Sequence, residues 1–229
     1  MRTIAILPIK SFGAAKQRLS GLLTGGSRET LAGAMFSDVL ATLRAAPAIH
    51  EIVVVTANRV ADDVAGGSIS VIHDPQESGQ SAAAGLGISH ALEAGHDRVL
   101  LVPGDTPLLD AEELGAMLER AEAAGTAVTI VPDRHGKGTN ALVLIPPTAI
   151  APAFGPDSLA RHAAAAEVAG VSYRIEQVAG LMLDIDTPAD LAALSATLAG
   201  ADGRAPATRV ALARLGQAPA ESPQLEVRS

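Results

Sequence analysis

Short apolar runs that are rich in β-branched residues alternate along the chain with longer segments of helical periodicity. The expected strands are residues 3–7, 51–56, 70–72, 98–102, 127–131, 141–145, 172–178 and 181–183. The expected helices are residues 27–46, 58–65, 81–94, 110–124 and 158–169, with a last helix that begins at residue 187. Strands that are apolar on both faces must be covered on both faces. The pattern therefore predicts an α/β fold of three layers, with helices on either side of a mostly parallel sheet.

Polar residues indicate where several of these helices begin. Ser27 and Ser81 are the expected N-caps of two helices, and Asp110 with Glu113 has the spacing of a capping box. Thr187, followed by proline, has the pattern of an N-cap before the first helical residue.

The chain length suits one large domain, which we expect to span residues 1–199 of the 229. Residues 200–229 are rich in Ala, Pro, Gly, Arg and Ser. We expect a flexible tail there, with at most a short helix over residues 209–215.

The composition argues against several classes of function. Aromatic residues make up only 2% of the chain, so stacking platforms for nucleic-acid bases are scarce, and a net charge of −8 repels a polyanion. The absence of cysteine excludes disulfides, thiolate nucleophiles and cysteine-bound zinc. The apolar run at residues 3–7 is too short for a signal peptide, and no run has membrane-spanning length. We expect a cytoplasmic protein that binds neither nucleic acid nor membranes.

Ligands of parallel α/β sheets bind beyond the carboxyl ends of the strands, so the loops there are the candidate site. The first of these loops carries Lys10, Lys16 and Arg18 in an otherwise acidic chain. Lysine supplies a point charge and arginine a planar fork, both suited to a triphosphate. The alternative is an ordinary solvated basic loop. No Walker or dinucleotide-binding glycine motif follows the strand.

Carboxylates follow two of the later apolar segments. Asp105 comes after a buried strand and is flanked by Gly and Pro, a position suited to a Mg²⁺ ligand; the alternative is a turn Asp bonded to its own backbone. Asp184 and Asp186 are two residues apart in an extended segment and so face the same side. Two such charges need a metal or a Lys/Arg partner between them. Asp186 could instead serve only the dipole of the following helix.

Three further loops carry candidate ligand contacts. Asp74 could accept from the exocyclic amine of a base, with Gly79 and Ser81 facing the base or ribose. The loop over residues 135–140 offers donors from Lys137, Thr139 and Asn140. Gly155 and Ser158 precede a helix and could present amides to an anion, although an ordinary loop and N-cap is the alternative.

The six histidines show no metal-ligand spacing, and the chain lacks the Gly-x-Ser-x-Gly turn of α/β-hydrolases. We therefore expect no Ser-His-Asp triad, and we interpret the histidines as surface or core residues.

Taken together, these segments resemble the guanylyltransferases that make the activated three-carbon precursor of coenzyme F-420. Those enzymes act on 2-phospho-L-lactate or phosphoenolpyruvate and belong to the nucleotidyltransferase superfamily that includes the molybdenum-cofactor guanylyltransferases. The resemblance covers residues 3 to about 198 and rests on the order of residues 7–10, 15–19, 79–83, 104–108, 138–140, 154–158 and 184–191. This chain has Gly79-Gln80-Ser81 where the family often has Gly-Leu-Asn.

The resemblance implies a nucleotide-diphospho-sugar-transferase-like nucleotidyltransferase domain over residues 1–199. It implies that Thr139, Gly155 and Ser158 bind the phosphorylated acid, and that Asp105, Asp184 and Asp186 hold Mg²⁺. With the loops described above, the expected nucleotide-binding residues are Pro8, Lys10, Lys16, Asp74, Gly79, Ser81 and Asp105. The expected catalytic residues are Lys16, Arg18 and Asp105.

The expected reaction is GMP transfer from GTP to phosphoenolpyruvate or 2-phospholactate, with release of pyrophosphate. The attacking phosphate oxygen is already an anion at neutral pH, so no general base is needed. A transferase acting on a deazaflavin alcohol is the expected downstream partner. The alternatives are transfer of GMP or CMP to another acceptor, such as a molybdopterin or sugar phosphate, a glycosyltransferase on a similar fold, and a non-catalytic nucleotide-binding module.

Overall fold

The computed structural model describes residues 1–9, 16–57, 69–200 and 203–217. Within these ranges, seven strands form one sheet in the order β3-β2-β1-β4-β6-β5-β7. The strands are β1 (Thr3–Ile9), β2 (Glu51–Thr56), β3 (Ile69–His73), β4 (Arg98–Leu101), β5 (Val128–Pro132), β6 (Thr139–Leu144) and β7 (Tyr173–Ile175). Strand β6 runs antiparallel to both of its neighbours, and the other pairs are parallel. The expected mostly parallel sheet is confirmed.

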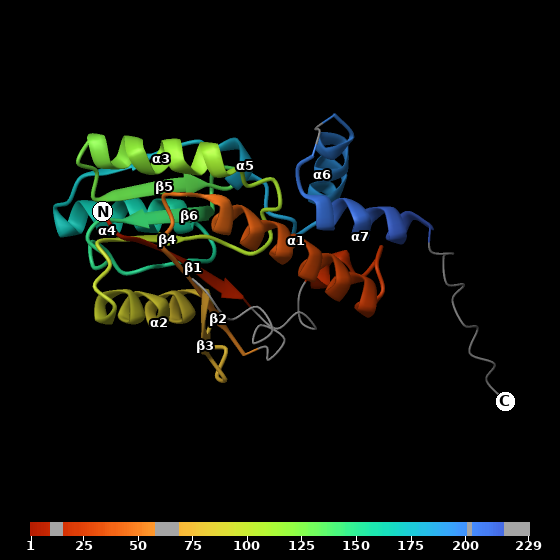
Figure 1. Ribbon diagram of the computed structural model, residues 1–229, viewed down its shortest axis with the longest axis horizontal. Helices are drawn as coiled ribbons and strands as arrows, with labels where there is room; N and C mark the ends of the chain where they lie inside the picture. The colour runs from red at the N-terminus through yellow and green to blue at the C-terminus, as the bar shows by residue number, and fades with distance from the viewer. Residues whose placement is uncertain (10–15, 58–68, 201–202, 218–229) are drawn as a thin grey trace.

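Helices cover both faces of this sheet (Figure 1). The helices of the described residues are η2 (Gln17–Leu19), α1 (Gly25–Ala45), α2 (Gln80–Glu93), α3 (Ala111–Ala123), α4 (Ser158–Ala169), α5 (Ala179–Met182), α6 (Pro188–Gly200) and α7 (Pro206–Gln217), of which α6 and α7 pack beyond the sheet with α1. One buried apolar cluster joins α1, α3 and α5 to the sheet, and a second joins α2 and α4 to the opposite face. Alternate residues of β1 belong to the two clusters, since Ala5 and Leu7 face the first and Ile4 and Ile6 face the second. The three-layer prediction is correct.

Two of the four expected N-cap residues are confirmed, and two are not. Asp110 accepts from the backbone N–H groups of Glu112 and Glu113 at 2.9 and 3.0 Å, as expected of an N-cap. Thr187 Oγ1 accepts from the N–H of Asp190 at 3.3 Å, which also agrees with the expected cap.

The expected caps Ser27 and Ser81 are wrong. Helix α1 begins earlier, and its cap is Thr24, whose hydroxyl accepts from the N–H of Ser27 at 3.2 Å. Gly79 is the residue before α2, and the hydroxyl of Ser81 instead accepts from the N–H of Phe154 at 2.9 Å. In both cases more than one residue near the helix start has cap chemistry, and the sequence alone does not choose between them.

Two expected segments need correction, and a third lies outside the described residues. Residues 181–183 do not form a strand, because helix α5 places Leu181 in the core under α3. A three-residue apolar run is too short to distinguish helix from strand. The strand expected over residues 172–178 is reduced to β7. The helix expected over residues 58–65 lies outside the described residues.

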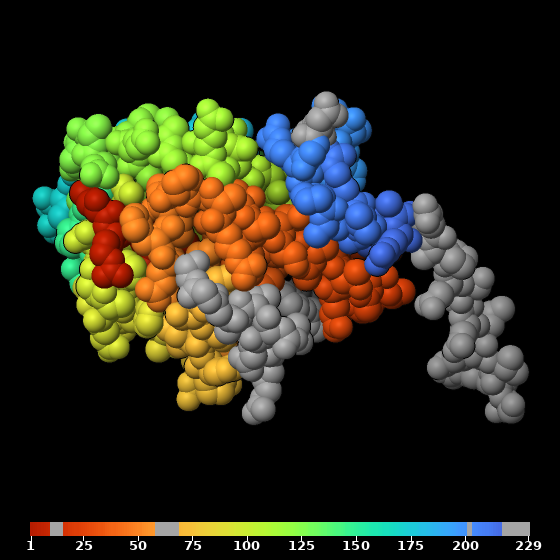
Figure 2. Space-filling model, in the orientation of Figure 1, coloured from red at the N-terminus to blue at the C-terminus, as the bar shows by residue number. Residues whose placement is uncertain are grey.

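The flexible tail expected from residue 200 is wrong for residues 203–217, where α7 packs along α1. The carboxylate of Asp38, on α1, accepts from the N–H groups of Ala207 and Thr208 at 3.0 and 2.8 Å and so caps α7 from another element. Ala211 joins a third apolar cluster that includes residues of α1 and α6. Figure 2 shows α7 seated against the surface of α1.

Among the described helices, none combines the length and the apolar character needed to cross a membrane.

Candidate functional site

A pocket of about 300 Å³ opens at the carboxyl edge of the sheet. It is built by the loops after β1, β2, β3 and β4 and by the segment before α6. Its lining residues are Pro8, Ile9, Lys16, Ala32, Val55, Ala57, Asp74, Glu77, Gly79, Gln80, Ala83, Pro103, Gly104, Asp105 and Asp186. Six of the expected site residues are therefore in one cavity: Pro8, Lys16, Asp74, Gly79, Asp105 and Asp186.

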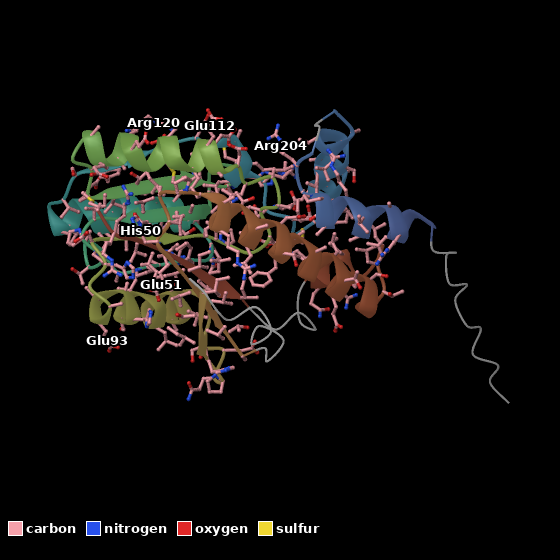
Figure 3. The ribbon with its side chains drawn as sticks, in the orientation of Figure 1. His50, Glu51, Glu93, Glu112, Arg120 and Arg204 are labelled. Carbon is pink, nitrogen blue, oxygen red and sulfur yellow. The ribbon has the colours of Figure 1, made fainter. Side chains whose placement is uncertain are left out.

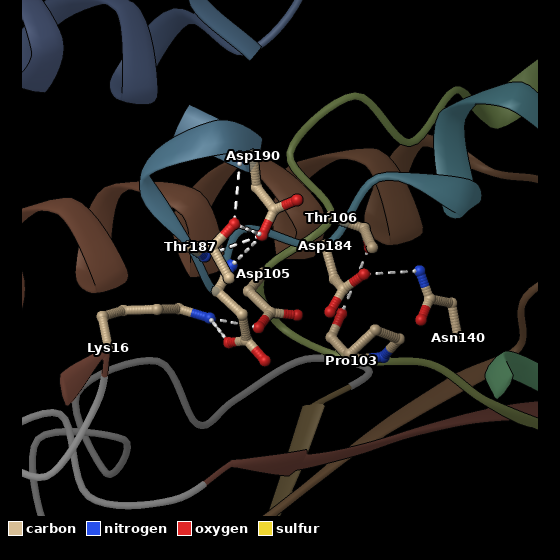
Figure 4. Close-up of polar contacts among 9 residues, drawn as sticks. Lys16, Pro103, Asp105, Thr106, Asn140, Asp184, Thr187 and Asp190 are labelled. Carbon is tan, nitrogen blue, oxygen red and sulfur yellow. Dashed lines mark hydrogen bonds and ion pairs between the residues drawn. The ribbon is translucent and has the colours of Figure 1, made fainter. Parts of the chain in front are cut away.

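Lys16 is the cation at the centre of the polar part of this pocket. Its side chain is only 6% exposed, and its ammonium group pairs with Asp105 Oδ2 and, at 3.0 Å, with Asp186 Oδ1 (Figure 4). Burial alone lowers the pKa of Lys16, but the charges of Asp105 and Asp186 and the hydrogen bonds to them outweigh burial. The pKa of Lys16 is therefore raised above its ordinary value. The ammonium remains charged and acts as a fixed cation.

Asp105 is positioned by a loop that lies close against β1 and α1. A Cβ atom on the preceding Gly104 would be 2.3 Å from Ile9 Cδ1 and 3.3 Å from Phe36 Cδ2, so these side chains would have to shift to accommodate a larger residue. The backbone oxygen of Asp105 accepts from the N–H of Ile185 at 3.3 Å, which joins this loop to the second acidic segment. Asp105 Oδ1 is buried and has no hydrogen-bond partner among the described residues.

Asp184 lies beside the pocket and is held by Asn140. Asn140 Nδ2 donates to Asp184 Oδ1 at 3.1 Å and to the carbonyl oxygen of Leu181 at 2.8 Å. Burial raises the pKa of Asp184, the charges of Asp105 and Asp186 raise it further, and the hydrogen bond from Asn140 opposes them. Asp184 thus lies in a region with an excess of negative charge.

Asn140 reaches this position because of the direction of β6. Leu142 pairs with Leu101 of β4, and the strands are antiparallel, so the start of β6 lies at the edge where β4 ends. The segment that carries Asp186 is fixed separately by Asp190, whose Oδ2 accepts from the N–H groups of Asp186 and Thr187 at 3.1 and 2.7 Å.

Sequence reasoning missed the positioning roles of Asn140 and Asp190. For Asp190 a signal existed, because Thr187 and Asp190 have capping-box spacing. For Asn140 no local signal existed, since its partners are more than forty residues away.

The acidic residues fit a divalent cation. Asp105, Asp184 and Asp186 bring three carboxylates to one region against the single ammonium of Lys16, and Asp105 Oδ1 is a buried oxygen left without a partner. No group of three or more His, Cys, Asp or Glu side chains in the described ranges encloses a metal position by itself. A site with fewer protein ligands still suits Mg²⁺, because this ion is usually bound by one or two carboxylates, with water and substrate phosphates as its other ligands. Asp186 pairs with Lys16. A Lys or Arg partner was one of the two ways in which the charges of Asp184 and Asp186 were expected to be offset.

Two expected ligand contacts, Arg18 and Ser81, do not line the pocket, and a third expected contact lies outside the described residues. Arg18 lies on η2, is exposed and does not line the cavity. Ser81 bonds to Phe154, as described above, and Lys10 lies outside the described residues.

The expected acceptor residues form a second cluster that does not line this cavity. The N–H of Thr139 donates to Ser158 Oγ at 2.8 Å, and the N–H of Ser158 lies 3.2 Å from the carbonyl oxygen of Gly155. Thr139 immediately precedes Asn140 on β6, and because successive side chains of a strand point to opposite faces, Thr139 faces α4 whereas Asn140 faces α5. His162 completes it, with Nδ1 3.0 Å from Thr139 Oγ1. The only sequence signal for His162 is its spacing from Ser158, since residues four apart share a helix face.

Three of the other histidines lie at the far edge of the sheet. His50 immediately precedes β2 and lies beside Glu51 (Figure 3), while the Nε2 atoms of His90 and His96 are each 2.8 Å from a Glu51 oxygen. None of the described residues that line the pocket is a histidine.

Comparisons with known proteins agree with this fold and with the expected family. The family model described as "Guanylyl transferase CofC like" matches residues 3–227, a range that extends past the expected end of the resemblance and includes α7. A phosphoenolpyruvate guanylyltransferase from Conexibacter woesei is 47% identical over 216 residues, covering 94% of this chain and 97% of that protein.

Solved structures are similar in fold. A protein from Desulfovibrio desulfuricans, described as a nucleotide-diphospho-sugar transferase, has a TM-score of 0.76 at 17% identity and covers 95% of this chain and 96% of its own. A nucleotidyl transferase from Methanothermobacter thermautotroptrophicus has a TM-score of 0.63 at 17% identity, with 86% and 98% covered. The expected nucleotide-diphospho-sugar-transferase-like fold is confirmed. With the family model matched over nearly the whole chain, the protein belongs to the CofC-like guanylyl transferases.

Proposed function

We propose that this protein transfers GMP from GTP to phosphoenolpyruvate and releases pyrophosphate. The observation that carries the proposal is the convergence of Lys16, Asp105 and Asp186 in one pocket at the carboxyl edge of the sheet. The name of the relative from Conexibacter woesei supports GTP and phosphoenolpyruvate as the substrates.

The pocket divides into an acidic part, in which Lys16 is the cation among the described lining residues, and a part suited to the nucleoside. Asp74 and Gly79 line the wall formed by the end of β3 and the start of α2. A carboxylate accepts hydrogen bonds from the ring N–H and exocyclic amine of guanine. We assign Asp74 to the base and Lys16 to the phosphates.

In the proposed reaction, a phosphate oxygen of the acid attacks the α-phosphorus of GTP. The new P–O bond forms as the bond between the α-phosphorus and the bridging oxygen breaks, and that oxygen leaves with pyrophosphate. The attacking oxygen is already ionised, so no protein group removes a proton, and the pocket lining has no histidine among its described residues. Lys16 remains charged and stabilises the negative charge that develops on the leaving group.

Mg²⁺ is part of the proposal. Asp105 would hold it together with Asp184 or Asp186, and the metal would supply positive charge that offsets the negative charge of the phosphates. Asn140 and Asp190 keep the second acidic segment in place for this task.

The acceptor end of the site is assigned to Thr139, Gly155 and Ser158. The product is a mixed diphosphate of GMP and the acid, the activated three-carbon precursor in coenzyme F-420 biosynthesis. We propose that a transferase acting on a deazaflavin alcohol consumes it.

The test is a matrix of nucleotides and acceptors with the purified full chain. GTP, CTP and ATP are each combined with phosphoenolpyruvate, 2-phospho-L-lactate, 3-phosphoglycerate and a sugar phosphate in the presence of Mg²⁺. Mass spectrometry identifies the product, and a coupled assay measures pyrophosphate. The proposal expects GTP with phosphoenolpyruvate to give the highest kcat/KM. A clear preference for CTP or for another acceptor would contradict it, as would GTP binding without pyrophosphate release.

A further inference from the structure

A buried hydrogen-bonded cluster joins the start of β6 to α4, behind the exposed turn at Gly155. It comprises Thr139, Ser158 and His162, whose exposed fractions are 7%, 1% and 0%. Thr139 contributes two contacts: its N–H donates to Ser158 Oγ at 2.8 Å, and its Oγ1 lies 3.0 Å from His162 Nδ1. On the other side of the ring, His162 Nε2 lies 2.8 Å from the backbone nitrogen of Ala153.

The contact with Ala153 determines which ring nitrogen of His162 carries the proton. A backbone N–H only donates, so His162 Nε2 must accept. Burial, and then the charge of Arg161, lowers the pKa of His162 to about 4, so the ring is neutral at physiological pH. A neutral imidazole that accepts at Nε2 is protonated at Nδ1. His162 Nδ1–H therefore donates to Thr139 Oγ1.

This assignment leaves two adjacent hydroxyl groups with their own protons available. Thr139 Oγ1 accepts from His162, and Ser158 Oγ accepts from the N–H of Thr139. Among the described residues, neither hydroxyl donates to a protein acceptor, and a buried donor without an acceptor is costly. Two such donors beside the exposed Gly155 turn suit an anion.

His162 also holds the loop that precedes this turn. Besides its bond to Ala153, its ring packs edge-on against Phe154, with ring centres 5.2 Å apart at 75°. The N–H of Phe154 donates to Ser81 on α2, the helix whose first turn lines the nucleotide pocket. The loop that carries Gly155 is thus anchored to both α4 and α2.

We infer that His162 is a positioning residue for the acceptor: fixed as the neutral Nδ1–H tautomer, it turns the hydroxyl of Thr139 into a hydrogen-bond donor to the phosphorylated acid. The inference deepens the proposed function and rests on it, because it takes Thr139 as a contact of the acid. His162 itself touches neither substrate and acts through Thr139.

Two substitutions separate the two contacts of the ring. In His162→Asn, the side-chain amide can take the position of Nδ1 and donate to Thr139, while the bond from Ala153 is lost. In His162→Gln, the longer side chain can bring its carbonyl oxygen to the position of Nε2 and accept from Ala153, while the donor to Thr139 is lost. The pair therefore distinguishes the orientation of Thr139 from support of the loop.

Steady-state kinetics on the full chain give the first readout, after thermal melting has checked the fold of each variant. We expect His162→Gln to raise KM for phosphoenolpyruvate about tenfold, the effect of one lost hydrogen bond, with KM for GTP unchanged. We expect His162→Asn to stay within about threefold of wild type. If His162 only supports the loop, His162→Gln is the milder variant, and that order would overturn the inference. An equal rise in KM for both substrates would also overturn it.

A double-mutant cycle tests whether the effect passes through Thr139. Thr139→Val removes the hydroxyl, so adding His162→Gln to it should change kcat/KM for phosphoenolpyruvate little further. Fully additive effects would mean that the two side chains act independently, and would contradict the inference.

The tautomer has a readout that needs no turnover. Nitrogen-15 NMR of the imidazole signals, with His162 assigned from its absence in His162→Asn, should show a neutral ring protonated at Nδ1 at pH 7. Protonation at Nε2 would overturn the inference whatever the kinetics show. If wild-type protein transfers GMP to no phosphorylated three-carbon acid, the proposed function fails and the acceptor role of Thr139 fails with it. The NMR result still decides the hydrogen-bond direction.

Discussion

Asp105 is the side chain on which the pocket depends most directly. One of its carboxylate oxygens pairs with Lys16, and the other is buried without a hydrogen-bond partner among the described residues. A buried carboxylate oxygen without a partner is costly, and a cation or a ligand donor that reaches it offsets this cost.

Asp105→Asn keeps the shape of the side chain and removes its charge, so we expect kcat for GMP transfer to fall by about 10²–10³-fold, as for other preorganised electrostatic sites. Pyrophosphate release at saturating GTP and phosphoenolpyruvate measures it. Glu119→Gln, on the exposed side of α3, removes one charge elsewhere and serves as the control. Near-normal turnover of Asp105→Asn would refute the role of this carboxylate.

Asp184 leads to a prediction about stability in the absence of metal. Its pKa is raised, so between the unfolded value of 3.8 and the folded value the native state binds more protons than the unfolded state. The contribution of Asp184 to the free energy of unfolding therefore decreases as pH rises through that window. Above the folded pKa, the full cost of the buried charge is present. Asp184→Asn removes the charge, and its amide oxygen can still accept from Asn140.

In EDTA at pH 7.5, we accordingly expect Asp184→Asn to melt at a higher temperature than wild type, while its Mg²⁺-dependent turnover is lower. The difference in melting temperature should shrink as the pH is lowered to 4. A variant that melts below wild type at pH 7.5 would show that the charge of Asp184 is compensated in the metal-free protein.

For single residues, roles that depend on one loop could be predicted from the sequence. Roles that depend on partners far along the chain could not. Lys16, Asp105 and Asp186 were expected at the carboxyl edge of the sheet and meet there. Arg18 was expected with them from its place in the same loop, but η2 leaves it exposed outside the pocket. His162 was interpreted only as a surface or core residue, because its contact with Thr139 depends on the packing of α4 on β6.

At the element scale, helix α5 connects the core to the acidic segment. Its Gly180 lies so close to α3 and the preceding loop that a Cβ atom would be 2.5 Å from the backbone oxygen of Leu108. The N–H of Gly180 donates to Glu113 at 3.0 Å, which is why Glu113 does not close the capping box expected with Asp110. The carbonyl oxygen of the next residue, Leu181, orients Asn140.

Gly180→Ala should therefore push α5 away from α3 and disturb Asn140 and Asp184. We expect a lower melting temperature together with reduced kcat, since overpacking against a backbone atom costs about 1–3 kcal/mol. The matched control is Gly115→Ala on α3, where a Cβ atom meets nothing within 4 Å, and which should be neutral or stabilising. Equal melting temperatures for Gly180→Ala and wild type would contradict the close approach.

The start of helix α7 depends on a side chain of another helix. Asp38 caps it from α1, so Asp38→Ala should destabilise the protein by about 1 kcal/mol. For a domain of this size that corresponds to roughly 2–4 °C in melting temperature. Ser37→Ala, which removes an exposed hydroxyl bonded within α1, is the control. If the two variants melt alike, the cap contributes nothing measurable.

The periodic elements could be predicted because their patterns are long, whereas their ends and connections depend on tertiary contacts. The apolar runs at β1, β2 and β4 identify strands without ambiguity. The sequence did not predict that α7 is an ordered helix, because its cap comes from a residue about 170 positions earlier in the chain. A composition rich in Ala, Pro and Gly suggested a flexible segment, because Asp38, which stabilises α7, is far away in the sequence.

On the scale of the whole molecule, the site follows from the order of the strands. The chain proceeds from β1 outward to β2 and β3, and then returns to place β4 on the other side of β1. Ligands of open α/β sheets bind beyond the carboxyl ends of the strands at such a reversal. The pocket lies there, between Pro8 and Ile9 at the end of β1 and residues 103–105 after β4. The sequence predicted the edge of the sheet, but the strand order that locates the reversal required the structure.

The most direct test of the account follows the α-phosphorus of GTP. Purified protein is incubated with Mg²⁺, phosphoenolpyruvate and GTP labelled with ³²P at either the α or the γ position, and the products are separated. We expect the α label to appear in a nucleotide containing the three-carbon acid, and the γ label to appear only in pyrophosphate. Transfer of the γ label to the acid, or release of inorganic phosphate without a labelled adduct, would contradict guanylyl transfer at this site.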